Sequence, residues 1–450
     1  MKKNILKANV DFLNGPILKG LIAFAIPVLI SNLFQQLYNT VDTMIVGHYL
    51  GDSSLAAIGS CTSIYDLLVG FALGIGNGLA IVTSRSFGSK NEELLKKSVA
   101  AALIIGFGSA LLITLIGTVS LKPLLSILNT PADIINESYS YISVVVLFTS
   151  VMFAYNLCAG LMRSIGNAIA PLIFLVISSI LNIILDVVFI TQFNMGVAGA
   201  AVATVLAQGI SVVLCVIYIF KKTQLLIPEK EHFAYDKSLY NEMIGQGYSM
   251  GFMGSIVSAG SVILQYGING LGTLTIAGHT AARKMYMFFL MPFIALGVSI
   301  STFVGQNRGA NQPKRIREAI IIGYKCDVAL AAGMTVILAF LAPTLIKTIS
   351  GSTEAIVINN GAAYLRFVAP FYAVLGVLLQ TRNALQGIGQ KLLPLISSVI
   401  EFIGKVLFVI IFIPKFQYAA VIACEPVIWI VMTAQLLLAF WNNDYIKSAK

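Results

Sequence analysis

The feature that most constrains this fold is a series of twelve apolar runs. Because about 20 apolar residues suffice for a helix to cross a bilayer, each run is long enough to span a membrane. Only 11% of the 450 residues are charged, less than half the proportion of about 25% in soluble proteins. We therefore predict an all-α polytopic membrane protein and exclude a soluble enzyme. The predicted spans are 21–47, 55–84, 98–121, 139–161, 169–191, 197–220, 243–271, 285–304, 319–346, 361–380, 392–413 and 419–441.

The basic residues between these spans are distributed unevenly. Twenty-one lysines and arginines lie in segments on the side of the two termini, and 3 lie on the opposite side. Since positively charged segments are retained in the cytoplasm, we predict a multi-pass protein of the cytoplasmic (plasma) membrane with both termini cytoplasmic. The net charge of +10 is spread along the chain, so no nucleic acid is predicted as a partner. Besides the lipid bilayer, nothing in the sequence indicates an obligate protein partner.

The chain also repeats itself at a spacing of 223 residues. Residues 163–193 align with 386–416 without a gap, and 11 of the 31 aligned positions are identical. Two halves with an even number of helices each insert in the same orientation. We therefore predict two parallel six-helix lobes around a central cleft, an architecture typical of transporters. The predicted parts are an N-terminal lobe (1–222), a cytoplasmic linker (223–242) and a C-terminal lobe (243–450).

Polar residues form a stripe along one face of the first predicted helix. Gln35, Asn39 and Asp42 follow the i, i+4, i+7 spacing of a helical face, and Tyr38 lies one turn before Asp42. An acidic residue inside an apolar helix costs about 2.5–3.5 kcal/mol on insertion scales, so it calls for an explanation. The stripe indicates that this side of the helix faces other protein groups.

The predicted topology places four polar residues at one depth. Asp42, Asp186 and Asn182 lie toward the outer ends of the first and fifth helices, and Thr204 lies near the start of the sixth. Two carboxylates, an amide and a hydroxyl suit a small hard cation or a shared proton. We therefore predict a binding site for H+ or Na+, and no other metal or cofactor. The same groups could instead hold the helices together by hydrogen bonds.

Several motifs in the first half resemble those of the multidrug and toxic compound extrusion (MATE) family. The resemblance rests on Pro27, Tyr38 to Asp42, Arg85 to Gly88, Arg163 to Asn167, Asn182 to Asp186 and Phe193 to Thr204. It implies a cation-coupled antiporter that expels amphipathic, often cationic, organic compounds. It also implies that the positions of Asp42, Asn182, Asp186 and Thr204 contribute to proton or sodium binding. Some relatives carry an acid in the seventh helix, whereas residues 243–271 contain none.

Four further charged residues are candidates for lining the cleft or contacting substrate. Glu401 precedes Lys405 by four residues, the spacing of a helical ion pair. Glu425 and Arg366 are expected either to pair with each other or to line the cleft. Asp66, which we place deep in the second helix, could contact a charged substrate.

These observations predict a function. We expect a secondary active transporter that exports amphipathic, cationic organic small molecules (multidrug efflux) in exchange for H+ or Na+ by alternating access. The alternative is a lipid-linked oligosaccharide flippase of the same superfamily, whose anionic substrate would require several basic residues in the cleft. The sequence has no GxxxxGK[ST] or HExxH motif and no CxxC, so no enzyme is predicted.

Overall fold

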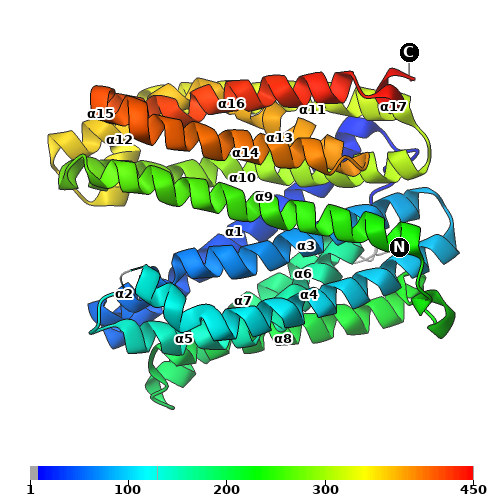
Figure 1. Ribbon diagram of the computed structural model, residues 1–450, viewed down its shortest axis with the longest axis horizontal. Coiled ribbons are helices and arrows are strands. Elements are labelled where there is room, and N and C mark those ends of the chain that lie inside the picture. Colours follow the sequence, from blue (N-terminus) through cyan, green and yellow to red (C-terminus); the bar gives the residue numbers. More distant parts are fainter. Residues whose placement is uncertain (1–8, 129, 449–450) are drawn as a thin grey trace, which may run out of the picture. The chain divides into compact units, whose positions relative to one another are not determined.

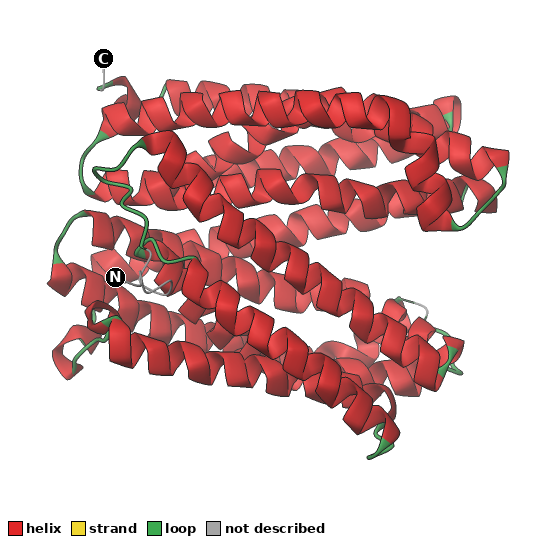
Figure 2. Ribbon diagram, turned by 180° about the vertical axis from the view of Figure 1, so that it is seen from behind, coloured by secondary structure: helices red, strands yellow, loops and turns green. Residues whose placement is uncertain are grey.

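The computed structural model describes residues 9–128 and 130–448, and both chain ends lie outside this range. The described residues form helices and loops, without a β-strand (Figure 2). The first half contains α1 (Ile17–Leu50), α2 (Asp52–Ser60), α3 (Thr62–Gly88), α4 (Glu92–Ile127), α5 (Ile135–Leu147), α6 (Thr149–Ser164), α7 (Ile169–Thr191) and α8 (Gly196–Lys222). Two short 3-10 turns follow, η2 (Gln224–Leu226) and η3 (Lys230–Phe233).

The second half begins with three long helices and ends with shorter ones. They are α9 (Lys237–Asn269), α10 (Thr273–Gly309), α11 (Pro313–Ser350), α12 (Ala355–Val368), η4 (Ala369–Phe371), α13 (Tyr372–Gly387), α14 (Leu392–Leu407), the π-helical turn η5 (Phe408–Phe412), α15 (Ile413–Phe416), α16 (Tyr418–Trp441) and α17 (Asp444–Lys447). In the described residues, 11 helical segments are long and apolar enough to cross a membrane, or up to 12 if α5 and α6 together form one span. The predicted all-α, polytopic fold class is confirmed.

Four predicted spans are interrupted, the eleventh by the π-helical turn η5. The second span breaks at Cys61 between α2 and α3, and the fourth bends by 46° between α5 and α6. The tenth passes through a 3-10 turn that contains Pro370, as expected because proline lacks the N–H that an α-helix requires. In contrast, α7 has the bounds predicted from its apolar run, 169–191.

The structure divides into two compact units, and each contains part of α1 and part of α9. One unit comprises the described residues up to Leu13 together with Ile26–Ser255, and the other comprises Asn14–Ala25 and Ile256–Lys450. Pro27 lies in α1 close to the point where that helix passes from one unit to the other.

In the first unit, α3 packs closely against the first part of α9, and α4, α6 and α8 complete the core (Figure 1). A Cβ atom on Gly74 would lie 2.7 Å from the Met250 carbonyl, and one on Gly78 would lie 2.6 Å from the Gln246 carbonyl. Such distances are shorter than atoms tolerate. The two glycines therefore allow the helix backbones to touch.

In the second unit, α10 packs against α11, α12 and α13. An aromatic stack fills its interior: the Tyr372 ring stacks on Tyr286 and on Phe293, and Tyr286 also stacks on Trp429. Aromatic pairs of this kind combine a large buried area with a preferred geometry. They fix the helices that carry the charged residues described below.

Candidate functional site

The predicted cation-binding residues come together in the first unit. Asp42 lies on α1, Asn182 and Asp186 lie one turn apart on α7, and Thr204 lies on α8. The carboxyls of Asp42 and Asp186 are within hydrogen-bonding range of each other, and Asn182 Nδ2 donates a hydrogen bond to Thr204 Oγ1 at 3.3 Å. These four residues form what we call the acidic cluster.

The acidic cluster is buried and contains more acceptors than donors. Asp186 is 0% exposed, Asn182 2% and Asp42 9%. Both carboxylate oxygens of Asp186, Oδ1 of Asp42 and Oδ1 of Asn182 accept no hydrogen bond from the described residues. Neither carboxyl has an ion-pair partner there. Because two carboxylates side by side repel each other, they require a proton or a cation between them. The ligand set therefore fits H+ or a hard cation such as Na+.

Of the three predicted neighbours of this cluster, Tyr38 shares a cavity with two of its members. Its hydroxyl interacts with the side chains of Gln35 and Gln208. Tyr38, Asn182 and Thr204 line one small cavity together with Ser178, Ser179, Gln208, Leu175 and Ala207. Asn39 is exposed, so its side chain does not contribute to the buried part of the cluster.

Asp66 occupies a different position from the one predicted. The sequence places it deep in a helix that begins near residue 55. Because the helix is broken at Cys61, Asp66 instead lies in the first turns of α3, where it is exposed. It is not part of the acidic cluster.

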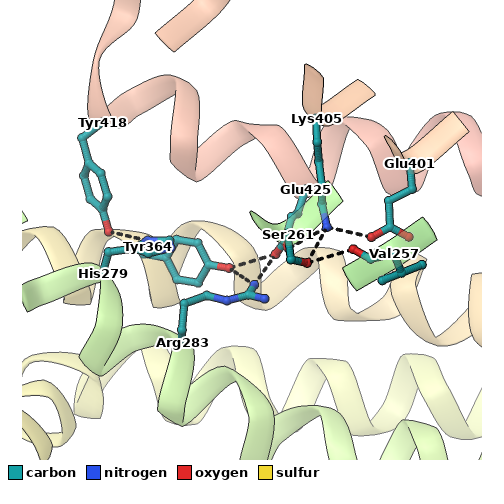
Figure 3. Close-up of polar contacts among 9 residues, drawn as sticks. All are labelled: Val257, Ser261, His279, Arg283, Tyr364, Glu401, Lys405, Tyr418 and Glu425. Carbon is teal, nitrogen blue, oxygen red and sulfur yellow. Dashed lines mark hydrogen bonds and ion pairs between the residues drawn. The ribbon is translucent and has the colours of Figure 1, made fainter. Parts of the chain in front are cut away.

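A second group of charged residues lies in the second unit and joins α10, α12 and α16 (Figure 3). Arg283 Nη1 donates to Glu425 Oε2 at 2.6 Å and to the Tyr364 hydroxyl at 3.1 Å. The Tyr364 hydroxyl in turn donates to Glu425 Oε2 at 3.0 Å. The Arg283 guanidinium also lies 4.4 Å from the centre of the Tyr286 ring, a cation–π contact.

The other predicted pair of this unit is formed as expected. Lys405 Nζ donates to Glu401 Oε1 at 2.8 Å and lies 3.9 Å from Glu425 Oε1. Arg366 takes no part: it is exposed, and its Nε donates to the Ala339 carbonyl at 3.0 Å. The pairing of Glu425 with Arg366, one of two alternatives left open by the sequence, is not formed, because Arg283 takes that position.

Two charged residues were not among the predicted site residues. Arg283 falls outside the predicted eighth span, which begins at residue 285, whereas α10 begins at Thr273. Asp327 is the single acidic residue in the predicted span 319–346. An acid within an apolar span is costly, so its presence there indicates a candidate functional residue. Asp327 is fully buried against Gly376 of α13 and next to Gln380, and neither of its carboxylate oxygens has a hydrogen-bond donor among the described residues.

Comparison with known proteins places this architecture among membrane transporters. The MatE family model matches two segments, residues 27–188 and 250–411. Both the starts and the ends of these matches are 223 residues apart, which is the spacing of the internal repeat, so the predicted duplication is confirmed.

Individual relatives match over nearly the whole chain. The probable multidrug resistance protein YpnP of Bacillus subtilis (strain 168) is 25% identical over 398 residues, with 87% of each chain covered. The multidrug export protein MepA of Staphylococcus saprophyticus is 21% identical over 431 residues, covering 95% of this chain and 93% of that one. Among solved structures, an outward-facing multidrug resistance MATE family transporter of the MOP superfamily matches with a TM-score of 0.90 and 21% identity, covering 98% of this chain and 99% of the other. This likeness shows that the fold is shared.

Proposed function

This chain belongs to the MatE family, and we propose that it is a secondary active transporter that exports amphipathic, cationic organic compounds in exchange for H+ or Na+. As a family member it is a multi-pass membrane transporter rather than an enzyme. The names of its curated relatives refer to multidrug resistance and multidrug export, which supports multidrug efflux as the activity. The proposed location is the plasma membrane.

The observation that carries the proposal is the shortage of donors and positive charge in the acidic cluster. Asp42 and Asp186 are buried side by side without a basic partner among the described residues. A buried carboxylate without a partner is costly. Binding of H+ or Na+ removes that cost, and release of the ion restores it. The cluster can therefore take up a positive charge in one state of the transporter and give it up in another.

The position of Asp42 on α1 suggests how this binding is coupled to transport. A cation held by Asp42 and Asp186 ties α1 to α7, so its arrival or departure changes the packing of α1. We propose that the ion enters from outside, that the resulting shift of α1 releases substrate outward, and that loss of the ion to the cytoplasm resets the cycle by alternating access. The ion can drive the exchange only to the extent that its affinity differs between the two states.

The alternative, a lipid-linked oligosaccharide flippase, is not favoured. An anionic pyrophosphate needs basic groups whose charge is available. Lys405 and Arg283 are each paired with a glutamate, and Arg366 is directed to the Ala339 carbonyl.

The test is gradient-driven efflux of a fluorescent organic cation from cells that express Asp42→Asn, Asp186→Asn or the unaltered protein at equal levels. Each substitution keeps the shape of the side chain but removes its ability to exchange a charge. We expect efflux to fall by about tenfold or more, because about 1.4 kcal/mol of lost differential binding already has that effect. Asp52→Asn is the matched control, since Asp52 is exposed in the first turn of α2. Undiminished efflux in both cluster variants would disprove the proposal, and proton and sodium fluxes measured side by side in proteoliposomes identify the ion.

A further inference from the structure

The internal repeat allows the polar groups of the two units to be compared position by position. At the spacing of 223 residues, Asn182 corresponds to Lys405 and Tyr38 corresponds to Ser261. In the first unit, Tyr38 and Asn182 line the same cavity. In the second, Lys405 Nζ donates to Ser261 Oγ at 3.2 Å. The two positions that correspond in sequence are therefore also neighbours in each unit: they line one cavity between α1 and α7 in the first unit, and they share a hydrogen bond between α9 and α14 in the second.

The acids of the first unit have no counterparts at these positions. Gln265 stands at the position of Asp42, and Val409 stands at that of Asp186. The acids near Lys405 stand at other positions, Glu401 on α14 and Glu425 on α16. The helix α16 is the counterpart of α8, which carries Thr204 in the first unit.

The side chain of Lys405, on α14, is surrounded by groups from its own helix and from α9 and α16 (Figure 3). Only 2% of its side chain is exposed, although lysine is almost never fully buried without a partner. Its ammonium contacts Glu401 and Ser261 and lies near Glu425. Gly260 leaves room for the aliphatic stem, since a Cβ atom there would lie 3.2 Å from Lys405 Cδ.

The charges around Lys405 also differ from those of the acidic cluster. Lys405 pairs with Glu401 and Arg283 pairs with Glu425, and Arg382 adds a further positive charge near Glu401. No oxygen of these two glutamates is among the buried atoms that lack a hydrogen-bond partner in the described residues. In the acidic cluster of the first unit, by contrast, four acceptor atoms have no donor among the described residues.

We propose that Lys405 is a tethered cation: in the second unit, its ammonium takes the place that the coupling ion takes in the first. The site formed by Glu401, Ser261 and Glu425 accordingly exchanges no H+ or Na+ during transport, in contrast to the acidic cluster. This inference rests on the proposed function for the role of the acidic cluster. The cation site formed by Glu401, Ser261 and Glu425 can be tested without measuring transport.

The first experiment is chemical rescue of Lys405→Ala. This substitution removes three carbons and the ammonium, which n-propylammonium supplies again. We expect the melting temperature of the purified protein to fall by about 5 °C or more, because breaking a buried ion pair is strongly destabilising. Millimolar n-propylammonium is expected to restore most of that loss at constant ionic strength, whereas n-propanol is not. Lys415→Ala, at an exposed lysine, controls for nonspecific effects. Equal responses of the two variants and the unaltered protein to n-propylammonium would overturn the proposal.

A second comparison applies even if Lys405→Ala does not fold. Lys405→Met keeps the bulk of the side chain but leaves Glu401 without its cation, whereas the double variant Lys405→Met/Glu401→Gln removes both charges. We expect the double variant to be the more stable of the two and to transport with an unchanged number of ions per substrate, measured from the reversal potential. A single variant as stable as the double one, or a changed ion count, contradicts the proposal. Undiminished efflux in Asp42→Asn and Asp186→Asn would disprove the proposed function but would leave the stability results at Lys405 unaffected. Failure of the proposed function and failure of the tethered-cation proposal are therefore distinguishable.

Discussion

Thr204 contributes one hydroxyl to the acidic cluster, and that hydroxyl accepts the hydrogen bond that orients the Asn182 amide. The amide oxygen is thereby left without a donor among the described residues. If this oxygen is a cation ligand, its direction depends on Thr204. The role of Thr204 is thus to position Asn182.

Thr204→Val tests that role, because it keeps the shape of the side chain and removes the acceptor. We expect the cation concentration for half-maximal transport to rise about tenfold, as expected for the loss of one buried hydrogen bond of about 1.4 kcal/mol. The maximal rate is expected to change little. Thr204→Ser, which keeps the hydroxyl, serves as the control and is expected to behave like the unaltered protein. An unchanged half-maximal concentration in Thr204→Val would contradict this role.

For single residues, the sequence predicts which side chains face the protein interior more successfully than it predicts which side chains they contact. The i, i+4 spacing of Asn182 and Asp186 was sufficient to place both on one face of α7. The partner of Glu425 could not be found in this way, because Arg283 lies 142 residues away and meets it only through the packing of α10 on its neighbours. Local spacing carries no information about such a contact.

At the scale of helices, the glycines of α3 show that regular spacing in the sequence does not guarantee close packing at every position. Gly70, Gly74 and Gly78 follow one another at intervals of four residues, which predicts close approach by a neighbouring helix. In the structure, Gly74 and Gly78 touch the backbone of α9, whereas a Cβ atom on Gly70 would have nothing within 4 Å. Only two of the three positions require glycine.

Gly78→Ala is therefore expected to destabilise the protein. The added methyl group would meet the Gln246 carbonyl and the Gly247 Cα at 2.6 Å, and backbone atoms cannot move aside as a side chain can. We expect a loss of about 1–3 kcal/mol, measured as a lower melting temperature in detergent. Gly70→Ala is the matched control and is expected to be neutral or slightly stabilising, because alanine favours helix formation by about 1 kcal/mol over glycine. Equal melting temperatures for the two variants would argue against close contact between α3 and α9.

Helix bounds were predictable where the apolar run and the helix coincide, as in α7. They were not predictable where a helix continues beyond its apolar run, as α10 does through Arg283 and Lys284. Hydropathy marks the part of a helix that is suited to lipid, whereas the helix itself ends where its backbone hydrogen bonds end. Arg283 was missed for this reason.

For the whole molecule, the repeat was visible in the sequence because proline and glycine recur at fixed places, such as Pro171 with Pro394 and Gly166 with Gly389. Both glycines have positive φ, 89° and 100°, where residues with a side chain are disfavoured. The matching turns preserve the repeat while the chemistry of the two halves differs. The difference in chemistry was harder to predict. Glu401 and Lys405 have the spacing of an ordinary helical ion pair, and the special position of Lys405 becomes visible only when it is aligned with Asn182.

The orientation in the membrane also belongs to this scale. The excess of basic residues on the side of the termini predicts a cytoplasmic C-terminus. A green fluorescent protein fused to the C-terminus is expected to fluoresce, and alkaline phosphatase inserted in the loop between α4 and α5 is expected to be active, since that enzyme folds only outside the cytoplasm. The reverse pattern would contradict the predicted topology.

The division of α1 and α9 between the two units has a consequence for how such a chain can be cut. Asn14–Ala25, which include the start of α1, belong to the second unit. There, Ser299 Oγ donates to the Leu21 carbonyl at 2.9 Å and Arg315 Nη2 donates to the Gly15 carbonyl at 2.7 Å. Conversely, Lys237–Ser255 of α9 belongs to the first unit. A gene split between α8 and α9 would encode two fragments. The first would lack Lys237–Ser255 of its own unit, and the second would lack Asn14–Ala25 of its own unit.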